Sequence, residues 1–314
     1  MFQIPYQVTR SIRIDTPLAQ VQQTLVNFKT WPQWSPWLCL DKQTQLEYFG
    51  ADGTPGSGYR WSGQWIGQGQ IQQQNISAAN LDMRIEFFKP WRSVAKVGFK
   101  LKAISEDSTE VTWHMQGGLP FFLFFMKSGL QAYIGMDYQR GLLMLKDYLE
   151  TGLVYSNSEV LGIVDMPEQH YLGVSRTCSI DDISTSMQSA CADLQTGFAE
   201  TGLTRIGAPF TVLHEWNLKT RQCSYTFAFP IAAPAQPVNS TLIQASRAAT
   251  KALKIIHTGA YKHLGNGWAT GYCRLQNDKT LKANKKQPSF EIYISDPAEA
   301  AAKDLLTEIY IPVL

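Results

Sequence analysis

Residues 288–297, PSFEIYISDP, decide how the C-terminal half of this chain is interpreted. Side chains on a β-strand alternate between its two faces, so Phe290 and Ile292 share one face and Glu291 and Tyr293 share the other. If the second face is open to water, Glu291 is an ordinary surface residue. If that face lines a cleft, Glu291 is a polar anchor in an apolar pocket. The strand pattern leaves both interpretations open.

The composition indicates a compact globular protein with two domains. The chain has 314 residues, of which 44% are hydrophobic and 17% are charged. The net charge is +2 and the longest basic run is Lys285-Lys286, which argues against a dedicated nucleic-acid surface. The five cysteines include no C-x-x-C pair, so neither a disulfide framework nor a zinc site is indicated. We expect no metal and no cofactor.

Targeting signals are missing from the sequence as it stands. The N-terminal MFQIPYQVTR does not have the pattern of a signal peptide, and we expect a cytoplasmic protein. The most apolar segment is LPFFLFFM, residues 119–126. It is far shorter than the roughly 20 residues of a membrane span. We interpret it as the entry to a core helix, with membrane contact as the alternative.

The first half, residues 1–152, reads as one antiparallel sheet and a long helix. A strand, YQVTRSIRI, precedes Asp15 and Thr16, either of which can cap a helix that starts with Pro17. Six β-type runs separated by turn residues follow. A helical stripe closes this half: Leu130, Ile134, Tyr138, Gly141, Leu145 and Leu149. The order predicts a curved sheet wrapped around the last helix.

The phrase VNFKTWPQWSPWL (26–38), the strand series and the terminal helix resemble the SRPBCC superfamily, which includes START and polyketide-cyclase-like proteins. This resemblance implies a helix-grip fold. It also implies a hydrophobic cavity between the sheet and the long helix, which relatives use for lipids, polyketides or other apolar ligands. From the sequence alone, Trp31, Trp34 and Trp37 fit packing better than ligand contact.

The second half, residues 158–314, contains an internal repeat of strand, helix, strand, strand. The strands of the first copy are HYLGVSRTCS, PFTVLHEW and CSYTFAFPI, and those of the second are ATKALKIIHTGAY, PSFEIYISD and LTEIYIPVL. Ser179 and Asp182 match a capping box at the first helix. A short linker near residues 151–158 separates the two halves. The fold class is therefore α+β in both.

HTGAY (257–261), FEIY (290–293), the Asp-Pro pair at 296–297 and TEIYIPV (307–313) resemble the GyrI-like family, the effector-binding domain of bacterial transcription activators. The resemblance implies two modules side by side with a ligand cleft between them, and a hallmark glutamate, Glu291, that faces this cleft. In multidrug-sensing relatives that glutamate attracts cationic aromatic ligands. In one branch of relatives it takes part in hydrolysis.

Strand alternation then supplies further candidate ligand-binding residues. Phe290, Ile292 and Ile294 should pack on the helices and leave Glu291 and Tyr293 toward the cleft. Tyr310 on the last strand should face the same way. Trp268 lies on a helical stripe that suits either the core or the cleft. The remaining candidates, His214 and Trp216, come from aligning Pro209 with Pro288. A slip of one residue in this alignment would exchange the two faces of the strand.

These features predict a small-molecule binding protein for apolar or cationic aromatic ligands, used in sensing or sequestration. No helix-turn-helix pattern is visible, so we expect no DNA-binding domain and no direct nucleic-acid contact. The alternative is a hydrolase in which Glu291 is the catalytic residue, and the sequence leaves the question of an enzyme open. A regulatory protein partner is a third option. Ligand identity, oligomeric state and coupling between the two cavities are not determined by the sequence.

Overall fold

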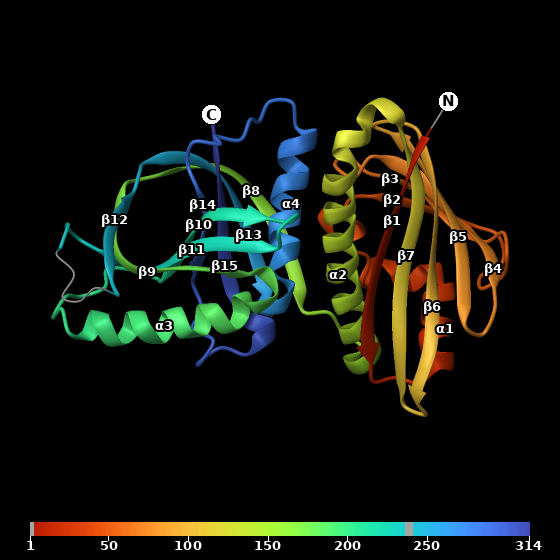
Figure 1. Cartoon of the computed structure of the whole chain (residues 1–314), viewed down its shortest axis with the longest axis horizontal. Coiled ribbons are helices and arrows are strands. Elements are labelled where there is room, and N and C mark those ends of the chain that lie inside the picture. Colours follow the sequence, from red (N-terminus) through yellow and green to blue (C-terminus); the bar gives the residue numbers. More distant parts are fainter. Residues whose placement is uncertain (1–2, 236–240) are drawn as a thin grey trace. The chain divides into compact units, whose positions relative to one another are not determined.

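A computed structural model describes residues 3–235 and 241–314. The chain divides into two compact units, Met1–Tyr155 and Ser156–Leu314, called here the N-terminal and the C-terminal unit (Figure 1). Both combine antiparallel sheets with helices, which confirms the predicted α+β class. Among the described residues, no helix is long and apolar enough to cross a membrane.

The N-terminal unit is a seven-stranded antiparallel sheet with the long helix α2 packed on it. The strand order is β1-β7-β6-β5-β4-β3-β2. This is the helix-grip arrangement that the SRPBCC resemblance implies. The elements are β1 Gln3–Ile14, α1 Leu18–Val26, η1 Phe28–Gln33, η2 Leu38–Leu40, β2 Gln45–Phe49, β3 Gly58–Ser62, β4 Gln68–Ile76, β5 Asn80–Lys89, β6 Ser93–Ser105, β7 Ser108–Pro120, η3 Phe121–Met126 and α2 Lys127–Thr151.

Aromatic rings fill the middle of the space between this sheet and α2. Trp113 of β7 stacks on Tyr138 of α2 with ring centroids 4.2 Å apart. Trp31 and Trp34 of the η1 region pack edge-on against Trp113. All four side chains are at most 2% exposed. The rings therefore occupy the region where the resemblance implies a ligand cavity, and they stabilise the unit as core residues.

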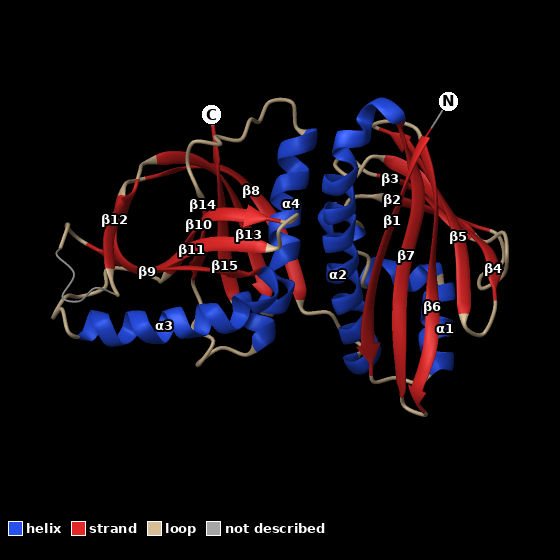
Figure 2. Cartoon of the chain, viewed as in Figure 1, coloured by secondary structure: helices blue, strands red, loops and turns tan. Residues whose placement is uncertain are grey.

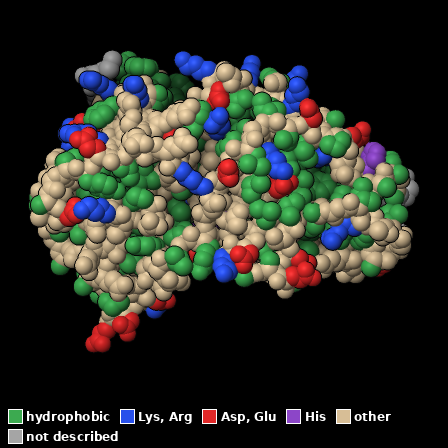
Figure 3. Space-filling model, turned by 180° about the vertical axis from the view of Figure 1, so that it is seen from behind, with side chains coloured by type: hydrophobic (Ala, Val, Ile, Leu, Met, Phe, Trp, Pro, Cys, Tyr) green, Lys and Arg blue, Asp and Glu red, His purple; other side chains and the backbone are tan. Residues whose placement is uncertain are grey.

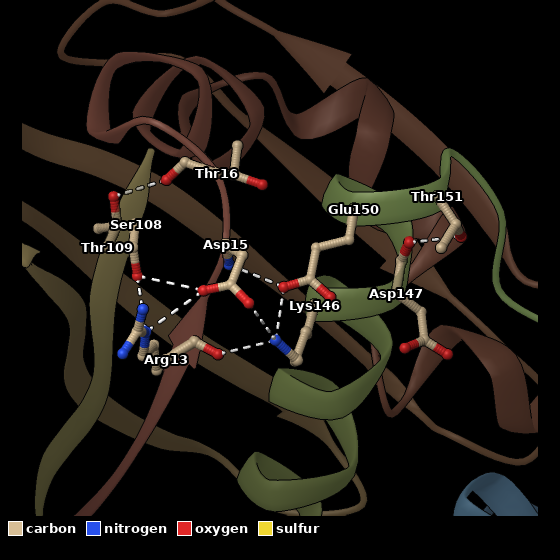
Figure 4. A network of polar contacts seen from close by, with 9 residues as sticks. All are labelled: Arg13, Asp15, Thr16, Ser108, Thr109, Lys146, Asp147, Glu150 and Thr151. Atoms are coloured by element: carbon tan, nitrogen blue, oxygen red, sulfur yellow. Dashed lines mark hydrogen bonds and ion pairs between the residues drawn. The ribbon is translucent and has the colours of Figure 1, made fainter. Parts of the chain in front are cut away.

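A polar network joins the end of β1, the start of β7 and the C-terminal part of α2 (Figure 4). The Asp15 backbone amide donates to Glu150, and Lys146 donates to the Arg13 carbonyl. The Asp15 side chain accepts a hydrogen bond from Ser108, so it does not cap α1. Pro17 occupies the N-cap position of α1 and no side chain caps the helix, so neither Asp15 nor Thr16 has the predicted role. The network is largely exposed and holds α2 to the sheet.

The segment predicted as the entry to a core helix, residues 119–126, does lead into α2, but its phenylalanines lie on the surface. The four phenylalanines of η3 are 51–66% exposed, and none of the residues of η3 is buried. The predicted position before a helix is confirmed, but burial of the segment is not: β7 pairs with β1 as far as Pro120 and α2 starts at Lys127, so η3 lies beyond the end of the sheet.

The C-terminal unit has, within the described residues, one eight-stranded antiparallel sheet in the order β12-β9-β11-β10-β14-β15-β13-β8 (Figure 2). Its elements are β8 Ser156–Met166, β9 Gln169–Ser179, η4 Ile180–Asp182, α3 Ile183–Ala199, β10 Phe210–Asn217, β11 Gln222–Ile231, β12 Ile243–Arg247, β13 Thr250–Gly259, η5 Tyr261–His263, α4 Leu264–Asn277, β14 Ser289–Tyr293, η6 Ala302–Asp304 and β15 Leu306–Val313.

The predicted repeat is present as β9-α3-β10-β11 and β13-α4-β14-β15, and β10 pairs with β14 where the two copies meet. The edge strands β8 and β12 lie outside the repeat. Strand β8 begins at Ser156, inside the segment expected to be a linker. Sequence reasoning missed it because an edge strand with alternating exposure and polar residues such as Ser158 and Glu159 resembles a loop.

Both helices of this unit lie on the same face of the sheet as Glu291. Paired residues on neighbouring strands share a face, and one such row runs across five strands: Phe227, Thr211, Glu291, Ile309 and Ile255. Phe227 belongs to the core under α3, whereas Ile309 and Ile255 belong to the core under α4.

Phe290 and Ile292 lie on the opposite face, in clusters with Tyr310 and Phe210. Ile294 follows the end of β14 and is 46% exposed. The prediction that Phe290, Ile292 and Ile294 pack on the helices was therefore wrong, because the helices cover the Glu291 face. The relative orientation of Glu291 and Phe290 was predicted correctly.

Candidate functional site

Glu291 is the centre of the candidate site. It lies on β14, between β10 and β15, and is only 5% exposed. Its Oε1 accepts a hydrogen bond from Nε1 of Trp268, and its Oε2 lies 2.7 Å from the Tyr293 hydroxyl. Burial raises the pKa of Glu291, and the two hydrogen bonds oppose that rise. Among the described residues, no Lys or Arg forms an ion pair with Glu291.

Tyr293 connects Glu291 to the first copy of the repeat. Its hydroxyl lies 2.9 Å from Oγ1 of Thr211 and 3.8 Å from the sulfur of Met187 in α3. Burial, the charge of Glu291 and the hydrogen bond to that carboxylate raise the pKa of Tyr293 well above its usual range. The phenol therefore stays protonated and donates a hydrogen bond to the Glu291 carboxylate. Side chains from both copies thus meet at the Tyr293 hydroxyl, which bonds Glu291.

Further aromatic rings lie next to Tyr293. The Tyr293 ring lies 5.9 Å from Phe227 and 5.8 Å from Tyr261, measured between ring centroids. Burial and the negative charges of Glu291 and Asp296 raise the pKa of Tyr261 to about 12. We call Glu291, Tyr293, Trp268, Thr211, Tyr261, Met187 and Phe227 the Glu291 site. Such a set offers one negative charge inside aromatic walls.

Two glycines in α4 place Trp268 over the strand. A Cβ atom at Gly267 would lie 2.6 Å from Cδ1 of Ile309, and one at Gly271 would lie 2.7 Å from Ile255 and Ile311. Both contacts are closer than real Cβ atoms make, so a larger residue at either position would have to push these isoleucine side chains aside. The close approach brings the indole within hydrogen-bonding distance of Glu291.

A polar strip continues from Tyr293 toward β8. Thr307 pairs with Tyr293 on one side and His257 on the other, and Nδ1 of His257 lies 3.0 Å from the hydroxyl of Ser158. Burial lowers the pKa of His257 to about 4, so the ring is neutral. Within residues 3–235 and 241–314, Nε2 of His257 and Oγ1 of Thr307 have no hydrogen-bond partner.

Tyr310 does not belong to the Glu291 site, although alternation along β15 suggested that it would. The register pairs Ile309 with Glu291 and Tyr310 with Phe290. Tyr310 therefore stacks on Phe290 on the far face, with ring centroids 4.8 Å apart, and its hydroxyl bonds Glu308. The prediction was wrong because the face of β15 is set by its pairing with β14.

His214 and Trp216 also lie away from Glu291, because the alignment with the second copy slips by one residue. Thr211, not Val212, pairs with Glu291. A register shift between Leu213 and Glu215 follows, and Nε2 of His214 contacts Thr226 on the face opposite the helices. Trp216 pairs with Cys223 near the other end of β10 and is 43% exposed.

Four residues of the Glu291 site were not among the predicted ligand-binding residues: Thr211, Met187, Phe227 and Tyr261. Tyr261 is part of the HTGAY phrase, which carries the family resemblance. Thr211 would have followed from aligning Phe210 with Phe290. Met187 belongs to a helical apolar stripe, and no sequence signal separates it from ordinary core residues. No group of three or more potential metal ligands occurs among the described residues.

Comparison with known proteins gives the family of the C-terminal unit. No match was found among curated proteins. The chain is similar to solved structures of EcmrR in complex with DNA (17% identity, 59% of this chain, TM-score 0.44), of SAV2435 bound to tetraphenylphosphonium (17%, 50% of this chain and 94% of SAV2435, 0.39) and of the Aha1 dimer from Colwellia psychrerythraea (18%, 46% of this chain and 97% of Aha1, 0.35).

This chain spans 65% of the length of that EcmrR chain. Residues 162–314 match the family model described as the GyrI-like small molecule binding domain. This stretch contains both copies of the repeat and every residue of the Glu291 site. Residues 162–314 of this chain are therefore a GyrI-like domain.

Proposed function

We propose that the Glu291 site binds an aromatic cation. The observation that carries this proposal is a buried carboxyl group with two hydrogen-bond donors, aromatic neighbours and no basic partner among the described residues. An ionised carboxylate in such surroundings is costly, and a ligand cation would offset the cost. The rings of Trp268, Tyr293 and Tyr261 would add cation-π and stacking contacts.

Capture of such molecules, for sensing or sequestration, fits the rest of the chain better than nucleic-acid binding does. The net charge is only +2. On the face that Figure 3 shows, Lys and Arg side chains are interspersed with Asp and Glu. A basic stripe of the kind that tracks a phosphate backbone is not what this composition favours.

Titration calorimetry with a charged and a neutral aromatic probe tests the proposal. Tetraphenylphosphonium is a suitable cation, and triphenylphosphine oxide is a similar molecule without the charge. Glu291→Gln should weaken tetraphenylphosphonium binding about 30-fold, the equivalent of losing about 2 kcal/mol of buried charge pairing. Binding of the neutral probe should stay within about threefold, since the walls remain.

Glu308→Gln is a matched control. Glu308 lies on the adjacent strand but faces the other side of the sheet, where it pairs with Lys254. Its replacement should leave tetraphenylphosphonium affinity unchanged. Equal affinity of the Glu291→Gln variant and the wild type for the cation would overturn the proposal.

A second candidate function, hydrolysis of a reactive small molecule, is favoured by the raised pKa of Glu291 beside the Tyr293 phenol. A carboxyl group tuned in this way suits general acid–base catalysis. The same variant separates the two functions. In a hydrolase, Glu291→Gln should abolish turnover while neutral substrates still bind, whereas in a binding protein there is no turnover to lose.

A further inference from the structure

The segment η3 exposes more apolar surface than a turn of a globular protein normally does. Phe121, Phe122, Phe124 and Phe125 are 56%, 51%, 66% and 65% exposed, and Met126 is 48% exposed. The rings contact each other in two edge-on pairs rather than the core. Contiguous exposed apolar side chains of this kind mark an interaction surface.

Trp91 lies at the same end of the N-terminal sheet and is 71% exposed. It belongs to the turn between β5 and β6, and Ala95 of β6 pairs with Gly117, three residues before β7 ends. The turn and η3 therefore leave the sheet side by side. We call Trp91 and the five exposed residues of η3 the aromatic tip.

The charges around the aromatic tip are of one sign. The two stretches that contain it, residues 87–100 and 111–136, have no Asp or Glu, and Glu86, just before the first stretch, is paired with Arg84. Lys89 and Arg92 flank Trp91 and are exposed, and Lys127 follows Met126 directly. Aromatic side chains with adjacent cations, and without acids, complement a surface that is apolar below and negatively charged above.

We propose that the aromatic tip docks on the surface of an anionic phospholipid bilayer. The phenylalanines and Trp91 would enter the interfacial layer, while Lys89, Arg92 and Lys127 would contact lipid phosphates. Insertion of a few rings is a surface attachment and needs no spanning helix. The basic residues favour a bilayer over a protein partner, because Lys89, Arg92 and Lys127, with no acidic residue among them, complement a continuous anionic surface.

Co-sedimentation of the full chain with vesicles tests this proposal. Wild-type protein should bind vesicles that contain about one part phosphatidylserine to three parts phosphatidylcholine, and should bind pure phosphatidylcholine more weakly. Phe124→Ser with Phe125→Ser should lower the partition coefficient at least about tenfold, because two exposed rings no longer enter the lipid. Arg92→Gln should lower it about fivefold, on the anionic vesicles alone.

Ile104→Ser is the control for a general loss of apolar surface. Ile104 is 45% exposed and lies beside the hairpin at the opposite end of the same sheet, so its replacement should change nothing. Trp91→Ser provides a second variant on a separate turn, with a reduction in the same direction. Wild-type protein that ignores both kinds of vesicle would overturn the proposal. A second result would also overturn it: sedimentation velocity shows a dimer, and the Phe124 and Phe125 substitutions dissociate this dimer without changing vesicle binding.

Discussion

The hydrogen bond from Trp268 to Glu291 gives a sharp test of how the Glu291 site works. Trp268→Phe keeps an aromatic ring but removes the Nε1 donor. Because Glu291 is 5% exposed, water would not replace that donor freely. A hydrogen bond to a charged group contributes about 1.5–3 kcal/mol, so the free energy of unfolding of the C-terminal unit should fall by about 2 kcal/mol at pH 8.

The same substitution should matter less when position 291 is uncharged. In a Glu291→Gln background the indole bonds a neutral amide, which is worth about 1 kcal/mol. The double-mutant cycle should therefore give a coupling of about 1 kcal/mol between the indole and the carboxylate at pH 8. In a unit of this size, 1 kcal/mol corresponds to about 2–4 °C in melting temperature.

Differential scanning calorimetry of the four proteins measures this coupling, at pH 8 and again at a pH low enough to protonate Glu291. The coupling should shrink at the lower pH, because a protonated carboxyl group accepts weaker hydrogen bonds. Tyr272→Phe is the control, since Tyr272 stacks on Trp268 but is 44% exposed. If Trp268→Phe lowers the melting temperature equally in both backgrounds at pH 8, the indole acts by packing alone and the reasoning fails.

Three further changes test the site and its supports. Because burial raises the pKa of Glu291, this group contributes stability that is present below its unfolded pKa and is lost as pH rises through its folded pKa. Glu291→Gln should therefore flatten the decline of the melting temperature of the C-terminal unit with rising pH. An unchanged decline would contradict this. Gly271→Ala should lower the free energy of unfolding, measured in urea, by about 1–2 kcal/mol despite the better helix propensity of alanine. The reason is that the new methyl group would lie 2.7 Å from two strand side chains. A gain in stability would mean that α4 shifts without cost. Asp137→Ala should lower the free energy of unfolding of the N-terminal unit by about 3 kcal/mol, because Arg140 is 8% exposed and Asp137 is its salt-bridge partner. A decrease below about 1 kcal/mol in urea unfolding would show that the Arg140 charge is solvated.

Much of the fold followed from local patterns. Helix α2 was predicted from its apolar stripe, and its buried residues include Tyr138, Gly141 and Leu145 from that stripe. The duplicated strand-helix-strand-strand order was visible because each copy buries its own helix against its own strands. Glu291, Tyr293 and Trp268 were all identified in the sequence, and hydrogen bonds join them in the structure.

The errors in strand orientation share one physical cause, which is that strand faces are decided by long-range pairing. In β15 the residues Ile309, Tyr310 and Ile311 are all at most 3% exposed, so both faces are apolar and alternation gives no direction. Only the pairing with β14 shows that Tyr310 accompanies Phe290. A run of apolar residues such as PFFLFFM is equally ambiguous, because hydrophobicity alone does not distinguish a core from an exposed surface.

The pairing of β10 with β14 also explains why the site carries a single charge. When two repeats meet across antiparallel strands, the residues at the symmetry axis pair with their own equivalents, and here Thr211 pairs with Glu291. A second glutamate at position 211 would lie against the first, and one of the two would be forced to hold a proton. Thr211 instead lies 2.9 Å from the Tyr293 hydroxyl and can donate to it, which leaves the phenol proton for Glu291. Both donors to Glu291, Trp268 and Tyr293, thus come from the second copy, and Thr211 of the first copy supports them through the Tyr293 hydroxyl. In the proposed function, this single carboxylate would pair with a ligand that carries one positive charge.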